Sequence, residues 1–276
     1  MIRSLITPLL ALALLGCSEK QDAPPPKAPP RSEQLAQSFP LLPMLEAKDW
    51  QKLITEEESL DDAQSEEERN TLANSIDKIA RRLQERHPFS ETETSTSLGG
   101  ITYDKASHEI AINARVRYPR EGDERHPGEL ELILCSTTGR AHETLFITDA
   151  RPLHLELLLH LVGYTKGSNS HRFHVDIETE NGSCIPVERL LKPKGSDELP
   201  ARLSWEFSGA DFDDLYSPDQ TGDFILCWHA HPSVLRVHHQ GIASGEVKLL
   251  AVPHEQLAQG QAVTIVITPQ NGEEKN

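Results

Sequence analysis

The chain has 276 residues and a formal charge of -16 at neutral pH, from 43 acidic and 27 basic side chains. An acidic surface repels nucleic-acid phosphates and anionic lipid headgroups, which excludes nucleic-acid binding and attachment to a membrane through a basic face. The length is sufficient for one domain of good size with additional segments.

The first residues have the features of an export signal. Arg3 gives a positive start, and residues 5–15 (LITPLLALALL) form an apolar run too short to span a bilayer comfortably. The run ends in LLGC, which resembles a lipobox and predicts a signal peptide over residues 1–16 and lipidation of Cys17, with palmitate among the acyl chains. The alternative is an ordinary signal peptide that happens to contain a cysteine.

The residue after the cysteine bears on localisation. Ser18 stands where an aspartate would favour the inner membrane, so resemblance to Gram-negative sorting points to the outer membrane, facing the periplasm. Residues 17–43 contain runs of proline, which keep the backbone extended. The sequence therefore predicts a lipoprotein of the cell envelope with a semi-rigid tether over residues 17–43.

Residues 44–88 predict a helical hairpin. Asp49 is placed to cap a helix that starts at Trp50, and residues 65–68 (SEEE) match a capping box that starts a second helix near Glu66. Pro88 ends this helix. One apolar stripe follows its length, made of Leu72, Ile76, Ile79 and Leu83. The stripe either packs on its partner helix and the main body, which we favour, or serves docking and self-association.

Between residues 95 and 270 the apolar pattern changes to alternation, which is typical of strands with one solvated face. Alternating runs cover residues 110–116, 130–134, 173–177, 203–207 and 263–267, and residues 224–228 (FILCW) are apolar throughout, which predicts a central strand. One clear helix starts at Pro152 and ends at Gly163. These elements predict an α+β domain with a mostly antiparallel sheet covered by one main helix, followed by a tail over residues 271–276.

Three cysteines remain besides Cys17, and none belongs to a C-x-x-C pair. We expect Cys135, Cys184 and Cys227 to be small buried apolar residues, and one disulfide among them is the alternative.

Four blocks of the main body carry a resemblance to a known family. They cover residues 139–144 (GRAHET), 149–154 (DARPLH), 204–209 (SWEFSG) and 219–225 (DQTGDFI). In this order and spacing they resemble the YdjY-type domain of exported bacterial proteins, over about residues 98–269. The resemblance implies a domain and no particular function. Three scattered thiols also do not match the roughly four grouped thiolates that an iron–sulfur cluster needs.

The first candidate site lies around the start of the predicted helix. His142 and His154 are a candidate pair for a polar site, as base, ligand or structural pin, with Glu143 beside His142. Adjacent strand residues point to opposite faces, so His142 and Glu143 share a face only if the turn bulges. Asp149 is placed to help cap the helix. We favour the structural pin, because no nucleophile stands in an activating motif.

The second candidate site is a pair of histidines near the predicted central strand. Cys227, His229 and His231 alternate, so a strand would place them on one face, and His229 with His231 could hold one metal ion with a third ligand from elsewhere. No cofactor is otherwise expected, and a divalent metal is the alternative.

Taken together, these features favour a non-enzymatic binding or interaction module, attached to the membrane by its lipid and facing a protein or other envelope partner. A histidine-based metal-binding protein or metal-dependent enzyme is the second hypothesis, and a structural protein that self-associates through residues 66–86 is the third.

Overall fold

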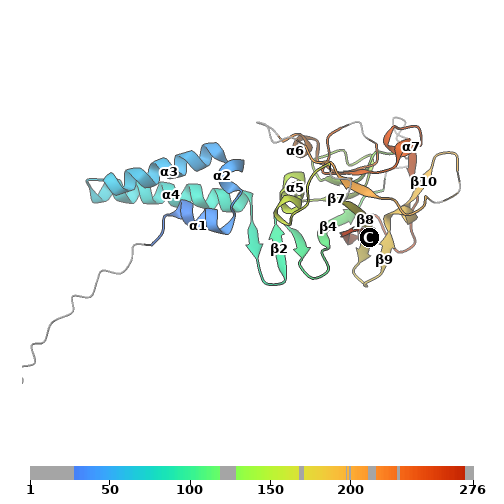
Figure 1. The fold of residues 1–276 in the computed structure, drawn as a ribbon, viewed down its shortest axis with the longest axis horizontal. Coiled ribbons are helices and arrows are strands. Elements are labelled where there is room, and N and C mark those ends of the chain that lie inside the picture. Colours follow the sequence, from blue (N-terminus) through green and yellow to red (C-terminus); the bar gives the residue numbers. More distant parts are fainter. Residues whose placement is uncertain are drawn as a thin grey trace, which may run out of the picture.

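The computed structural model describes residues 28–118, 129–167, 171–196, 198, 200–210, 216–228 and 231–270. A bundle of helices lies at one end of the molecule and a body rich in strands lies at the other (Figure 1). The predicted leader, Cys17 and the predicted tail lie outside the described residues.

The bundle consists of α1 (Arg31–Ser38), α2 (Leu42–Leu45), α3 (Ala47–Asp62) and α4 (Glu66–Arg86). The predicted start of α4 and its Ser65 cap are confirmed, because Ser65 Oγ accepts a hydrogen bond from the Glu68 N–H at 3.1 Å. The reciprocal bond of the capping box is displaced by one residue, since the Glu68 carboxylate accepts from the Gln64 N–H at 3.1 Å. Ile76, Ile79 and Leu83 are buried in the apolar core of the bundle. The apolar stripe of α4 therefore packs within its own chain, as favoured from the sequence.

Two expectations for this region are wrong. Residues 31–38 form α1 instead of continuing an extended tether, because Leu35 is buried in the bundle core and Ser32 N–H donates to Glu57 at 3.0 Å. Asp49 does not cap a helix at Trp50, since α3 begins at Ala47. Instead, Asp49 pairs with Arg82 at 2.9 Å and Arg86 at 3.2 Å, which ties α3 to α4.

The body contains a twelve-stranded sheet and a three-stranded sheet. The first comprises β1 (Phe89–Glu91), β2 (Ser95–Leu98), β3 (Ile101–Asp104), β4 (Ile110–Val116), β6 (Leu132–Ser136), β7 (Thr144–Thr148), β8 (Arg172–Thr179), β9 (Cys184–Pro186), β11 (Trp205–Phe207), β12 (Asp223–Leu226), β13 (Leu235–Val237) and β15 (Ala262–Pro269). The second comprises β10 (Leu191–Pro193), β14 (Leu249–Ala251) and β5 (Glu129–Leu130). A 3-10 helix (Val187–Leu190) and two short helices, α6 (Ser217–Thr221) and α7 (Gln240–Ala243), connect strands.

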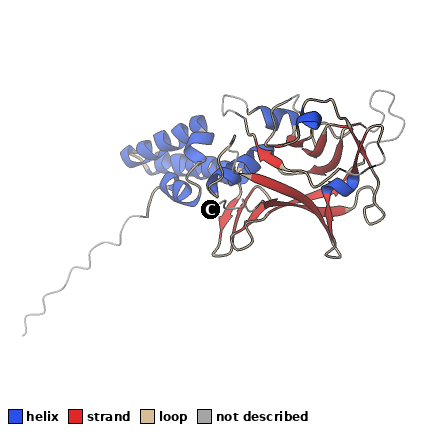
Figure 2. Ribbon diagram, turned by 45° about the vertical axis from the view of Figure 1, so that its right-hand side comes forward, coloured by secondary structure: helices blue, strands red, loops and turns tan. Residues whose placement is uncertain are grey.

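The large sheet closes on itself, which the sequence did not predict. Its order runs β4-β15-β8-β11-β13-β12-β6-β7, and β7 then pairs with β4 through Arg115↔Ile147 and Val116↔Phe146. Figure 2 shows the strands curving around the core. We call these eight strands the barrel. Pairing is antiparallel except between β6 and β7 and between β12 and β13. The mixed, mostly antiparallel α+β class is confirmed, but a simple sheet with one covered face is not observed.

The main helix, α5 (Pro152–Leu161), begins at the predicted proline and lies between the bundle and the barrel (Figure 1). Leu155, Leu158 and Leu159 belong to the core of the barrel, whereas Leu153 and Leu157 belong to the core of the bundle. The helix is buried on both sides, and its two buried polar residues, His154 and Glu156, have polar partners in His87 and Tyr216. Two apolar cores thus share one helix. Within the described residues no helix combines the length and apolar character that a membrane span requires.

The three described cysteines are free thiols. Cys135 and Cys227 are buried, as expected, but Cys184 is exposed. The expectation fails at Cys184 because it begins the short strand β9, which pairs only with β8 among the described strands.

Candidate functional site

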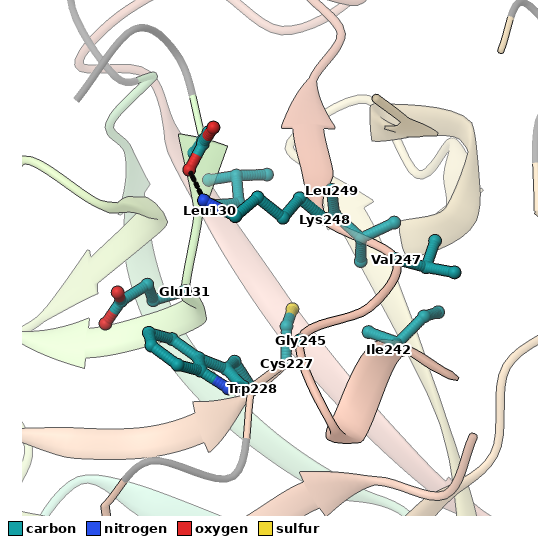
Figure 3. Close-up of a pocket in the computed structure, with 10 residues that line it drawn as sticks. Leu130, Glu131, Cys227, Trp228, Ile242, Gly245, Val247, Lys248 and Leu249 are labelled. Atoms are coloured by element: carbon teal, nitrogen blue, oxygen red, sulfur yellow. Dashed lines mark hydrogen bonds and ion pairs between the residues drawn. The ribbon is translucent and has the colours of Figure 1, made fainter. Parts of the chain in front are cut away.

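A pocket of about 70 Å³ opens beside the end of β12. We call it the Trp228 pocket, and Figure 3 shows its lining. Three segments that are distant in sequence build it: β5 with the next residue, the two residues after β12, and the region from α7 to the start of β14. The lining residues are Glu129, Leu130, Glu131, Cys227, Trp228, Ile242, Gly245, Val247, Lys248 and Leu249.

The end of β12 positions the two central residues of the pocket. β12 is buried throughout and ends at Leu226, after which the Cys227 N–H donates to the Glu131 carbonyl at 2.8 Å. The chain then reaches the surface, and Trp228 is 42% exposed, the one exposed large hydrophobic side chain among the described residues. The indole lies against Gly245, where an added Cβ would stand 2.8 Å from Nε1 and where φ is +78°. Glycine at this position therefore lets the indole lie over the turn.

Cys227 contributes an apolar wall and no reactive group. Its side chain is buried, and Figure 3 shows the sulfur pointing into the pocket. Burial raises the pKa of the Cys227 thiol, and the charge of Glu131 raises it further. A thiol held in its protonated form is a poor nucleophile and a poor metal ligand.

Charged side chains surround the mouth of the pocket. Glu129 accepts from both Lys194 Nζ and Lys248 Nζ, each at 2.6 Å. These hydrogen bonds, first from Lys194 and then from Lys248, lower the pKa of Glu129. On the other side, Glu131 is bound by the guanidinium of Arg140. The pocket thus combines an apolar interior with ionised groups at its rim, which is the usual composition of a ligand site.

His142 and Glu143 lie close together in the structure, but they do not line a cleft. The two residues precede β7, and His142 Nε2 lies 3.3 Å from Glu143 Oε1. His142 is half exposed, whereas Glu143 is buried and lies 3.5 Å from Arg140. Arg140 also binds the fully buried Asp223 at 3.0 Å. This arrangement is a buried ionic network that ties β7 to β12.

His154 lies elsewhere, at the contact between α5 and the bundle. Its Nε2 is 3.3 Å from His87 Nδ1, and both side chains are buried. The predicted pairing of His154 with His142 is therefore not formed. Asp149 is exposed and pairs with Arg115 at 3.3 Å. It does not cap α5, because Asp219 Oδ1 accepts from the Leu153 N–H at 2.8 Å.

The strand face expected to carry Cys227, His229 and His231 is not formed at Cys227, whereas the metal site at His229 and His231 stays a prediction. The strand ends at Leu226, so Cys227 and His231 do not continue one strand face. His231 is exposed in a bend, and His229 lies outside the described residues. Across the described ranges, no three His, Cys, Asp or Glu side chains are arranged to hold a metal ion.

Sequence reasoning singled out Cys227 but missed the rest of the Trp228 pocket. Trp228 was visible only as the end of an apolar run, and Ile242, Val247 and Lys248 lie in a segment without clear periodicity. No family model matches the sequence, and neither curated proteins nor solved structures give a match. The choice of the Trp228 pocket as the candidate site therefore depends on its geometry alone.

Proposed function

We propose that this protein is a lipid-anchored lipoprotein of the cell envelope that acts as a non-enzymatic binding module. Its binding site would be the Trp228 pocket, and the occupant a small aliphatic group of an extracytoplasmic ligand. One observation carries the proposal: the exposed indole of Trp228 stands at the mouth of an apolar pocket. Covering exposed apolar surface is favourable, at about 25 cal/mol per Å², and tryptophan often dominates binding surfaces.

The chemistry of the lining supports binding over bond cleavage. The Cys227 thiol is protonated, and the carboxylates of Glu129 and Glu131 are both engaged by cationic side chains. A nucleophile or general base needs an activated lone pair that faces the substrate. The described lining supplies dispersion contacts and fixed charges instead.

The anchor is the second part of the proposal. Cys17 would receive the lipid, and the proline-rich residues that follow would separate the folded body from the membrane. The resemblance to YdjY-type domains stays a separate hypothesis and does not indicate a ligand. Labelled palmitate should be incorporated into the wild-type chain and not into Cys17→Ser. Equal membrane association of both in detergent partitioning would contradict the anchor.

The pocket can be tested with a neutral aliphatic probe. We expect 3-methylbutan-1-ol to shift the indole N–H signal of Trp228 in NMR spectra of the full-length protein, with weak affinity because the probe is small. Val247→Phe fills the pocket and should abolish the shift. Val252→Phe enlarges a half-buried valine outside the pocket lining and should preserve it. A shift that survives Val247→Phe, or no shift in the wild type, would refute the site.

A further inference from the structure

The rim of the Trp228 pocket carries an excess positive charge on one side. Lys194 and Lys248 share the single carboxylate of Glu129, each with its ammonium at 2.6 Å. Among the described side chains, these two cations share one anion, which leaves one unit of positive charge uncompensated there. Both lysine side chains are about half exposed, at 54% and 55%. An ammonium has three N–H donors, so each lysine retains donors after it binds Glu129.

The opposite side of the rim is acidic but turned away. The Glu131 carboxylate is engaged by Arg140, and Figure 3 shows it pointing away from the Cys227 sulfur. The same arginine is 3.0 Å from Asp223 and 3.5 Å from Glu143, so the guanidinium lies among three carboxyl groups behind the pocket wall. The Lys248 side chain instead runs along the pocket toward Glu129 (Figure 3). The Lys248 ammonium therefore stands at the rim beside Glu129, where its remaining N–H donors can bind an anionic group of a ligand.

We propose, building on the proposed function, that the occupant of the Trp228 pocket is a small aliphatic carboxylate. Its alkyl group would contact Trp228, Cys227 and Ile242, and its carboxylate would bind Lys248. A cavity of about 70 Å³ is several times the ~10–15 Å³ that a single water needs, which suits a short branched chain of four or five carbons.

The acidic charge of the whole chain does not prevent this binding. The formal charge is -16, but salt screens exposed charges beyond a Debye length of about 8 Å at physiological ionic strength. The hydrogen bond between a carboxylate and an ammonium acts at contact distance and is charge-assisted. The local surplus at Lys194 and Lys248 therefore decides the sign of the preferred ligand.

Three probes with the same branched five-carbon skeleton separate this inference from the proposed function. They are 3-methylbutanoate, 3-methylbutan-1-ol and 3-methylbutan-1-amine, titrated into the full-length protein with the Trp228 indole signal as readout. We expect the carboxylate to bind at least fivefold more tightly than the alcohol, and the amine to bind most weakly. If the alcohol binds and the carboxylate gains nothing, or the amine binds most tightly, the charge inference is overturned while the pocket stands. If none of the probes binds, the proposed function itself fails.

Variants test the role of the lysine. Lys248→Met should reduce carboxylate affinity at least fivefold, so that within this variant the carboxylate no longer binds more tightly than the alcohol. Glu129→Gln removes the anion that competes for both lysines and should strengthen carboxylate binding. Lys105→Met breaks a comparable exposed ion pair, with Glu91 at 2.8 Å, outside the pocket and should change nothing. An undiminished carboxylate preference in Lys248→Met would overturn the assignment.

A carboxylate with a branched chain could be a free short-chain acid or the C-terminal residue of a protein. Acetyl-glycyl-leucine and its C-terminal amide distinguish the two sources. Tighter binding of the dipeptide acid than of 3-methylbutanoate, lost on amidation, would support a protein C-terminus. Binding of 3-methylbutanoate alone would support a free acid, whereas equal binding of the dipeptide acid and its amide would overturn recognition of the carboxylate.

Discussion

His154 Nε2 lies 3.3 Å from His87 Nδ1 in the buried contact between α5 and the bundle. His87 Nε2 is 3.0 Å from Glu46 Oε1, so this ring is held by a carboxylate on one side and by a histidine on the other. Arg86 and Arg151 act on the pair as nearby positive charges. The second nitrogen of His154, Nδ1, is buried, and no group in the described part of the chain forms a hydrogen bond of ordinary geometry with it. The contact between α5 and the bundle is therefore most stable when both imidazole rings are neutral.

We expect acid to weaken this contact. Burial lowers the pKa of His154 to about 3, with Arg151 and His87 acting in the same direction, and burial also lowers the pKa of His87. An unfolded histidine titrates near 6.5, so the unfolded state binds more protons below this pH. The stabilisation of the folded state by the neutral His154 ring is present above pH 6.5 and is lost as the pH falls below this value. From His154 alone we expect a loss of about 2 kcal/mol between pH 7 and pH 5.

Urea denaturation at several pH values measures this effect. His154→Leu removes the titrating group, so its free energy of unfolding should depend less on pH than that of the wild type. Equal slopes for wild type and His154→Leu would contradict the assignment.

Gly99 permits the close approach of His154 to the turn between β2 and β3. An added Cβ at Gly99 would lie 1.7 Å from His154 Nδ1, and φ is +60°. Gly100 also has a positive φ, +84°, but a Cβ there would meet nothing within 4 Å. Gly100→Ala should cost about 1 kcal/mol from the backbone alone, and Gly99→Ala should cost clearly more. Thermal unfolding of the two variants checks the difference, and equal losses would show that the steric contact is unimportant.

Local chemistry explains which parts of the fold were predictable. The cap at Ser65 and the start of α5 at Pro152 depend on neighbouring residues, so the sequence alone identified them. The same holds for β4, β8 and β15, where the residues that alternate as apolar in the sequence are alternately buried in the structure.

Closure of the sheet depends instead on two residue pairs between β4 and β7, which local periodicity does not encode. The Trp228 pocket likewise joins residues near 130, 227 and 245. Its key steric feature, the indole over Gly245, exists only after the chain has folded. Pairing His142 with His154 failed for the same reason: both lie near α5 in sequence, but His154 faces the bundle.

The thiols should differ in reactivity in the folded protein. Burial raises the pKa of Cys135 to about 12, and burial also raises the pKa of Cys227, whereas Cys184 is exposed. Partial burial, and then the charge of Asp176, also raise the pKa of the Cys184 thiol, so its reaction should be slower than that of a free thiol. With Cys17 replaced by serine, we expect a disulfide reagent at pH 8 to modify Cys184 in the native protein and the other two only after denaturation. Peptide mapping identifies the modified residue. Rapid modification of Cys227 in the native protein would show that the Cys227 wall of the Trp228 pocket is accessible to the reagent.

Asp219, and not Asp149, should stabilise the start of α5. Asp219 Oδ1 accepts from the Leu153 N–H at 2.8 Å, and Oδ2 accepts from Arg151 at 2.6 Å, which satisfies a free helix N–H and holds the residue before Pro152. Loss of such a cap costs about 1 kcal/mol. Asp219→Ala should therefore lower the free energy of unfolding by about this amount, measured by urea denaturation at pH 7. Asp149 is exposed, and its ion pair with Arg115 spans 3.3 Å at the surface, so Asp149→Ala should have little effect. A larger loss of unfolding free energy in Asp149→Ala than in Asp219→Ala would identify Asp149 as the cap.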